Sequence, residues 1–320
     1  MAPYAQHSVL EPAGPQASHI LRLFYGYLDV CALVFVLVIV ALGFALGRKR
    51  DENAEKRDPN PESARRKRRA VTWATAATVV TLVGLLVASV TTGHALSLMP
   101  PPDPIRVRVI AHKWWWEFRY ATTGAATQFN TAYELHVPVG RAVELRLIAP
   151  DVIHSFWVPS LSGKRDAIPG KDAVLLLQAD KPGVYEGQCA EFCGTQHANM
   201  RFLVVAESPE RFLAWRDHQL QSAAPPTEPL RRHGEQVFMT SRCRTCHAIS
   251  GTEAFGTVGP DLTHVASRRR LAMGTIENDR AHLKRWLVDP QAAKPGVQMP
   301  ATPLGAEDER ALLAYLEGLK

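Results

Sequence analysis

Cysteine is scarce in this chain of 320 residues, and charge is missing from two long stretches of it. Five cysteines are too few for a disulfide-dense scaffold. The composition, 46% hydrophobic and 21% charged with 23 Pro and 21 Gly, excludes a disordered or collagen-like chain. No internal repeat is present. The sequence therefore predicts a globular protein with room for two or three domains.

A net charge of +6 would ordinarily suggest nucleic-acid binding, but the surplus is confined to one segment. Residues 48–69 contain ten Lys or Arg against five Asp or Glu, whereas residues 103–320 contain 26 basic and 24 acidic residues. The basic segment lies between two apolar stretches, a position that indicates membrane topology. We expect a membrane and no nucleic acid among the partners.

The two apolar stretches are long enough to cross a bilayer. Residues 30–47 carry no charge and, at 1.5 Å per residue, cover roughly 27 Å as a helix. Residues 70–98 contain no Lys, Arg, Asp or Glu, and their only titratable side chain is His94. We predict transmembrane helices over about 21–47 and 70–98. A signal peptide followed by one buried core helix is disfavoured, because the first run is longer than a signal peptide's apolar core and begins some twenty residues into the chain.

The positive-inside rule orients this hairpin. Basic residues flank both spans on the side of the connecting loop, residues 48–69, which is therefore predicted to be cytoplasmic. The N-terminal segment, residues 1–20, and everything after Met99 then face outward. We expect a multi-pass protein of the bacterial inner membrane, with both termini and the functional groups on the periplasmic side.

The exported part divides into two domains. The first covers residues 103–222. Between residues 105 and 207 its apolar pattern has mostly period two; for example, Val143, Leu145 and Leu147 alternate with Glu144 and Arg146, whereas residues 208–222 are more helical. Turn signals punctuate these runs at short intervals, which predicts an antiparallel sandwich or barrel. Residues 223–229, rich in Ala and Pro, form a linker, and helical runs in residues 230–320 predict a smaller helical domain.

Cys243, Cys246 and His247 form the attachment pattern of a c-type haem. Two thiols bond the porphyrin vinyl groups, and the adjacent imidazole binds the iron. The same pattern alone would also suit a thiol-disulfide or zinc site. The exported compartment, the Gly259-Pro260 loop and a late Met299-Pro300 loop favour haem, with Met299 as sixth ligand. Met273 is the competing thioether, but it follows a run of arginines that is expected to be solvated.

A second constellation occupies residues 187–200, where Cys189 and Cys193 are followed by His197 and Met200. Thiolate, imidazole and thioether together form a ligand set for copper. A single blue-copper ion needs only one Cys, and in an exported domain the alternative for the second is a disulfide. His154 adds a second imidazole, so two sulfurs could bridge two metals with one His each.

At this point the chain resembles a known family, subunit II of the haem-copper cytochrome c oxidases, over about residues 8–215. With the haem domain it looks like the caa-type variety. The matching motifs are EPAGPQ at residues 11–16, AHKWWW at 111–116, HSFWVP at 154–159, RDAIPG at 165–170 and the cysteine loop. The resemblance implies a two-helix transmembrane hairpin, an all-β cupredoxin domain with Greek-key topology, and a small all-α class I cytochrome c domain.

The resemblance also implies the roles of individual residues in a dinuclear, mixed-valence CuA centre. Cys189 and Cys193 would bridge the two coppers, and His154 and His197 would each bind one. Met200 would be a weak axial ligand, and Glu191 would supply its backbone carbonyl. The carboxylate of Glu191 is also the candidate ligand for a magnesium ion at the interface with subunit I. Trp114 matches the aromatic residue through which electrons enter.

The function that follows is electron input to a terminal oxidase. Electrons would pass from covalent haem c to CuA and on to haem a in subunit I, where oxygen is reduced to water. The expected partners are subunit I, subunit III and a soluble or membrane electron donor. Many relatives have Glu and Pro where this chain has Ala70 and Ala77, near Trp73, which leaves open the alternative of a membrane-tethered carrier that serves a different acceptor. A copper-free quinol-oxidase-type subunit is disfavoured by the intact copper ligands.

Overall fold

The computed structural model describes residues 5–47, 61–96, 104–121 and 128–320, except for the side chain of Met273. The chain forms two compact units. Residues 18–99 form one, and residues 1–17 together with 100–320 form the other. The larger unit contains a β-sandwich and a mainly helical domain.

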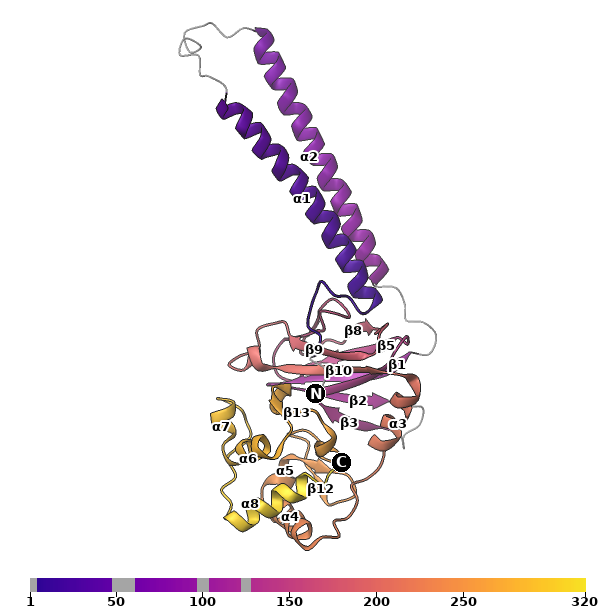
Figure 1. Ribbon diagram of the computed structural model, residues 1–320, viewed down its shortest axis with the longest axis vertical. Helices are drawn as coiled ribbons and strands as arrows, with labels where there is room; N and C mark the ends of the chain where they lie inside the picture. Colours follow the sequence, from indigo (N-terminus) through magenta and orange to yellow (C-terminus); the bar gives the residue numbers. More distant parts are fainter. Residues whose placement is uncertain (1–4, 48–60, 97–103, 122–127) are drawn as a thin grey trace. The chain divides into compact units, whose positions relative to one another are not determined.

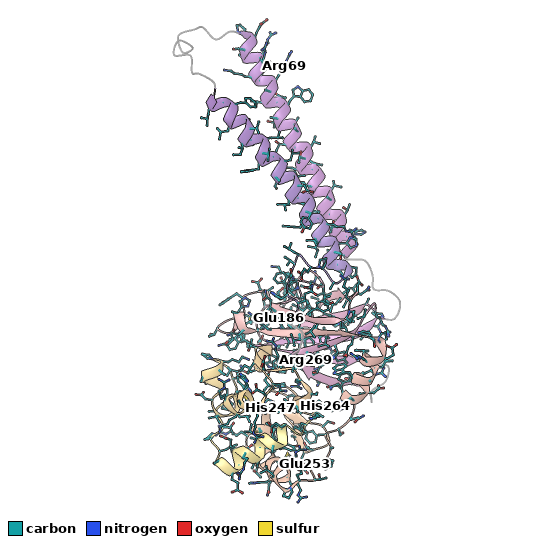
Figure 2. All side chains as sticks on the ribbon, viewed as in Figure 1. Arg69, Glu186, His247, Glu253, His264 and Arg269 are labelled. Atoms are coloured by element: carbon teal, nitrogen blue, oxygen red, sulfur yellow. The ribbon has the colours of Figure 1, made fainter. Side chains whose placement is uncertain are left out.

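The smaller unit is a helical hairpin of α1 (Pro15–Gly47) and α2 (Pro61–Leu96) (Figure 1). Both helices are long and apolar enough to cross a membrane. Their apolar side chains are exposed, and the Tyr27 hydroxyl of α1 donates to the Leu85 carbonyl of α2 at 3.0 Å. Because α2 begins at Pro61, earlier than the expected residue 70, the basic run from Arg65 to Arg69 belongs to this helix (Figure 2).

The β-sandwich consists of two five-stranded sheets (Figure 1). One has the order β3-β2-β1-β5-β8 and the other β4-β10-β9-β6-β7, so strands distant in sequence are neighbours in both. The pairs β1–β5 and β4–β10 are parallel, and the remaining pairs are antiparallel. The strands are β1 (Ile105–His112), β2 (Trp115–Ala121), β3 (Phe129–Ala132), β4 (Glu134–Pro138), β5 (Val143–Ile148), β6 (His154–Trp157), β7 (Arg165–Ala167), β8 (Ala173–Leu177), β9 (Gly183–Cys189) and β10 (Arg201–Glu207).

The alternating pattern explains how the sheets face each other. In β5, Val143, Leu145 and Leu147 are buried, while the residues between them lie partly or fully at the surface. The rings of Phe156 and Phe202 meet in the core with centroids 4.5 Å apart. The expectation of an all-β domain is confirmed here.

The segment before α1 packs on this sandwich. The backbone N–H of Gln6 donates to Val184 at 2.8 Å, and Glu186 donates back to Gln6 at 3.0 Å, which adds a short bridge to β9. Gly14 lies so close to the strands that a Cβ there would be 2.3 Å from the Gln178 carbonyl oxygen. The expected EPAGPQ motif thus lies against the sandwich, and only glycine fits at its centre.

The helical domain follows α3 (Pro209–Gln219) and a stretch, residues 221–228, without helix or strand. Its first and last long helices pack against each other, as expected for a class I cytochrome c. Gly234 permits the contact, since a Cβ there would be 2.0 Å from the Ala311 carbonyl oxygen. The elements are α4 (Pro229–Thr240), α5 (Cys243–Cys246), β11 (Ala248–Ile249), β12 (Ala254–Phe255), η3 (Val265–Ser267), β13 (Arg270–Leu271), η4 (Ala272–Gly274), β14 (Ile276–Glu277), α6 (Arg280–Val288), α7 (Pro290–Ala293) and α8 (Ala306–Leu316).

Candidate copper and haem sites

Five sulfur and nitrogen donors converge at one end of the β-sandwich. The Sγ atoms of Cys189 and Cys193 are 3.8 Å apart. His154 Nδ1 lies 3.8 Å from the first sulfur, and His197 Nδ1 lies 3.6 Å from the second. The Sδ of Met200 is 3.8 Å from Cys193 Sγ. The structure therefore brings together all the sequence-predicted copper donors.

The fold positions these donors from two places in the sequence. Cys189 ends β9, which pairs with β6 so that Cys189 stands opposite Phe156, two residues after His154. Cys193, His197 and Met200 lie on the connection from β9 to β10. Because adjacent strands deliver one His and one Cys, the site is anchored on rigid backbone and completed by a single loop.

The two thiols are free and buried, and they interact directly. The hydrogen bond with Cys193 lowers the pKa of Cys189 to about 4, and the same interaction raises the pKa of Cys193. The pair thus tends to keep one proton between two sulfurs. A metal that binds both as thiolates must displace that proton.

His154 is oriented by a partner that sequence reasoning missed. Its Nε2 lies 2.9 Å from Asp151 Oδ1, which leaves Nδ1 facing Cys189. Burial raises the pKa of Asp151, but the hydrogen bonds from His154, Val152 and Lys113 outweigh it and hold the pKa below its usual value. A carboxylate behind a metal-binding imidazole fixes the ring's orientation. The one feature of the sequence that could have indicated Asp151 is its position three residues before His154.

The donor set fits copper. Two thiols, two imidazoles and a thioether are soft and borderline ligands. His154, Cys189 and Cys193 are buried, and their ligand atoms lie within 4.8 Å of one another. The carbonyl oxygen of Glu191 lies 3.2 Å from Cys189 Sγ, so the backbone of this residue faces the site. Its side chain is exposed.

The haem-attachment residues occupy the turn of α5 after α4. His247, labelled in Figure 2, is held through Nδ1, which lies 2.7 Å from the Pro260 carbonyl oxygen and leaves Nε2 for the iron. Gly259 packs against the ring, since a Cβ there would be 2.5 Å from His247 Cε1. The Gly259-Pro260 pair therefore has a definite role, in that one residue makes room for the imidazole and the next one orients it.

A cavity of about 180 Å³ opens beside these residues. Cys243, Cys246 and His247 line it together with Met299, so the predicted attachment and axial ligands share one space. A second cavity of about 60 Å³ continues it into the apolar core of the helical domain. An apolar cavity with two thiols, an oriented imidazole and a thioether fits a c-type haem. The side chain of Met273, the competing thioether, lies outside the described residues.

Trp114 connects the two sites. Its indole N–H donates to the carbonyl of Cys193 at 2.9 Å, and its ring packs on Gly194, where a Cβ would be 3.0 Å away. The same side chain lines the haem cavity. One aromatic residue of the β-sandwich thus reaches from the copper loop to the space where haem would lie.

Further hydrogen bonds join the sandwich to the helical domain beside Trp114. Gln196 Nε2 donates to the Pro295 carbonyl at 2.8 Å, and Asn199 Nδ2 donates to Gln196 Oε1 at 2.8 Å, which orients the amide. Away from this point, the carboxylate of Glu134 accepts the backbone N–H of Arg269 (Figure 2). These contacts were missed because sequence spacing gives no sign of a bond between residues 196 and 295.

His136 lies buried next to the Glu134 contact. Its Nδ1 is 2.6 Å from Glu207 and its Nε2 is 3.5 Å from Glu134, while the ring stacks on Trp215 with centroids 4.0 Å apart. Burial disfavours the charged imidazole, but the two carboxylates outweigh it and raise the pKa of His136. The contact of His136 with Glu207 therefore ties β4 to β10 beside the contact with the helical domain.

These features define a membrane-anchored electron-transfer protein, with a copper-type β-sandwich and a cytochrome c domain. Family models agree with both parts. Residues 121–207 match "Cytochrome C oxidase subunit II, periplasmic domain" and residues 232–320 match "Cytochrome c".

Whole-chain comparisons extend the match to the membrane helices. The chain is 37% identical to cytochrome c oxidase subunit 2 of Alkalihalophilus pseudofirmus, over 98% of this chain and 91% of that protein. It is also 37% identical to the protein of the same name from Bacillus sp. strain PS3, over 68% of this chain and 63% of the relative. Among solved structures, the periplasmic domain of subunit II from Bradyrhizobium japonicum is 26% identical with a TM-score of 0.35, covering 38% of this chain and 96% of that one.

The chain belongs to the cytochrome c oxidase subunit II family, and its added cytochrome c domain is consistent with a caa3-type fusion. It is therefore a subunit of a haem-copper oxidase, which is an oxidoreductase complex. The family implies copper, and the second domain implies haem c. The predicted family and fold class are confirmed.

Proposed function

We propose that this chain is the subunit through which electrons enter a terminal cytochrome c oxidase. It would receive them at haem c in the helical domain and deliver them through dinuclear copper in the β-sandwich to haem a of subunit I. When bound, haem c and copper would each supply a redox centre that accepts one electron at a time. The observation that carries the proposal is Trp114, which is bonded to the copper loop and also lines the haem cavity.

In this proposal the chain's own residues hold, orient and enclose the two centres. Cys243 and Cys246 would attach the haem, and His247 and Met299, which line the same cavity, would bind its iron. The Pro260 carbonyl aims the His247 ring. These roles follow from the attachment pattern and from the shared cavity.

Cys189, Cys193, His154 and His197 would hold the copper through their sulfur and nitrogen atoms. Met200 is fully buried and would add a thioether to the ligands that hold the copper. Asp151 orients His154, and the sandwich core shields the sulfurs from water. Anchoring of His154 and Cys189 on adjacent strands favours a geometry that changes little when an electron arrives or leaves.

The contacts between the domains support transfer inside one chain. The Gln196–Pro295 hydrogen bond joins the residue before His197 to the loop that carries Met299. A tethered and bonded donor domain replaces diffusional docking by a high effective concentration. An electron from a soluble or membrane donor would therefore reach copper without dissociation of the haem domain.

We further propose the surroundings of the subunit. Packing of residues 5–17 on the sandwich supports one common side for the N-terminus and both cofactor domains, with the basic loop in the cytoplasm. The exposed carboxylate of Glu191, whose backbone faces the copper site, would bind magnesium at the contact with subunit I. Subunit III is the other expected neighbour.

The test compares two neighbouring tryptophans in the intact chain, with haem attached and copper loaded. Trp115 also lines the haem cavity, but it stacks on His112, with centroids 4.2 Å apart. We expect W114F to slow electron transfer from photoreduced haem to copper several-fold or more, and W115F to leave it close to the wild-type rate. Absorbance at the two centres measures this rate directly. Equal effects of both variants would show that Trp114 is only part of the cavity wall.

A second measurement identifies the acceptor. Purification of the chain from its native membrane should bring with it a subunit that contains haem a. If the chain purifies with its own cofactors but with no such subunit, it serves a different acceptor as a tethered carrier.

A further inference from the structure

The haem cavity has a wall with charge of one sign. Three cationic side chains line it, Lys113 from the sandwich and Arg242 and Lys294 from the helical domain. His247 is the other titratable nitrogen base in the wall. Within the described part of the chain, no Asp or Glu lines this cavity. Its electrostatic complement is therefore an anion.

Lys294 differs from the other two cations because it is buried. It follows α7 and is only 3% exposed, and its backbone N–H is bonded to Pro290 at 2.8 Å. Its ammonium nitrogen lies 5.1 Å from the centre of the Trp286 ring. Among the described residues, no carboxylate lies within 4.0 Å of it.

A buried ammonium without a counter-ion is unfavourable. Burial alone lowers the pKa of Lys294 to about 6. The contact with Trp286 is weaker than the hydration that the ammonium loses on burial, so it offsets only part of this cost. Because the buried Lys294 side chain lines the cavity, a molecule bound in the cavity could supply an anion to pair with the ammonium group.

Haem c carries two such anions, because each of its propionate groups ends in a carboxylate. We propose that Lys294 binds a propionate of haem c and forms a buried ion pair at the boundary between the haem and copper domains. This inference rests on the proposed haem site. It makes Lys294 a positioning residue, which fixes the haem in the cavity and neutralises a negative charge near the iron.

The position of Lys294 also connects the haem to the copper domain. The next residue, Pro295, accepts the hydrogen bond from Gln196, and a Cβ on Gly296 would be 3.8 Å from the Trp114 ring. The segment that would hold the propionate is therefore the one that contacts the copper loop. Correct seating of the haem and correct docking of the two domains would depend on the same three residues.

The test uses the intact holo-chain in detergent, with K294M as the variant and K284M as the matched control. Lys284 lies in the same domain, but its side chain is 54% exposed and pairs with Glu309 at 2.7 Å. The reduction potential of haem c is measured from pH 5 to 9. For K294M we expect the reduction equilibrium to shift about tenfold toward the oxidised form, which is about 59 mV for one electron.

The variant should also acquire a pH dependence that the wild type lacks in this range, because its unpaired propionate can take up a proton. K294R should restore the wild-type profile, and K284M should not change it. A K294M chain with the wild-type potential and pH profile would refute the ion pair. Failure of the wild-type chain to attach haem would instead refute the haem site itself.

A measurement on the wild type covers the case in which K294M does not fold. Infrared difference spectra of the haem c redox change should show at least one propionate that stays ionised from pH 9 to pH 5. Protonation of both propionates within this range would show that Lys294 binds neither of them.

Discussion

The substitution Gly234→Ala separates helix propensity from tertiary packing in the haem domain. Gly234 lies in the middle of α4, where it meets α8. A Cβ at this position would be 2.0 Å from the Ala311 carbonyl oxygen and 2.7 Å from Tyr315 Cβ. Since non-bonded heavy atoms settle at roughly 3.5 Å, the helices would have to separate by about 1.5 Å at this point.

Two effects of opposite sign then compete. Alanine in a helix interior is more favourable than glycine by about 0.8–1.0 kcal/mol. Overpacking of a tight contact costs about 1–3 kcal/mol, occasionally more, and here the obstacle is backbone, which cannot rotate away. We expect packing to dominate: a cost at the upper end, about 3 kcal/mol, less a gain of about 1 kcal/mol lowers the free energy of unfolding by about 2 kcal/mol.

The assay is guanidinium unfolding of the intact holo-chain, followed at the haem absorbance, which reports the haem domain alone. Gly305→Ala is the control, because nothing lies within 4 Å of a Cβ at this position, the N-cap of α8. The control should lower the free energy of unfolding by less than about 1 kcal/mol. If the Gly234 variant is as stable as the wild type or more stable, helix propensity governs this site and the tight contact has no energetic role.

Two further predictions concern the copper domain. The pKa of His136 is raised above its ordinary value of 6.5, so the charged ring stabilises the fold fully below pH 6.5 and this stabilisation is lost as the pH rises through the raised pKa. The free energy of unfolding should therefore fall as the pH rises from 6.5 through the raised pKa. Urea unfolding followed by tryptophan fluorescence measures this fall. The variant H136Q should lose this pH dependence, and persistence of the dependence would assign it to another group. Met200 is fully buried, so M200L should change the free energy of unfolding by less than about 1.5 kcal/mol, yet the copper electron paramagnetic resonance spectrum should change because the thioether is gone. An unaltered spectrum would show that Met200 does not bind copper.

Sequence reasoning predicted the elements and ligands that depend on local pattern. Period-two alternation gave the β-sandwich, and the two uncharged runs gave the hairpin. The start of α2 was placed too late, because the basic residues before Ala70 are good helix formers and the helix continues through them to Pro61. Close spacing identified Cys189, Cys193, His197 and Met200 as a group, and the structure brings their donor atoms to within 3.8 Å of a neighbour.

The supporting residues could not be predicted in the same way. The role of Asp151 in orienting His154 becomes visible only in the structure, where β6 places His154 beside Cys189. Gln196 and Lys294 look like ordinary surface residues in the sequence. Their roles arise from contact between segments about a hundred residues apart, and no local pattern encodes such a contact.

By itself the sequence identified the donor groups of this protein, because thiols, imidazoles and thioethers at short spacing form ligand sets for copper and for haem. Uncharged runs of bilayer length likewise specified its attachment to a membrane. Only the tertiary structure decided that Trp114 donates to the Cys193 carbonyl and also lines the cavity of Cys243, Cys246 and His247, and that a buried lysine lines the same cavity with no carboxylate beside it among the described residues. The physical reason is that burial, desolvation and hydrogen bonding between distant segments exist only after the domains have packed together.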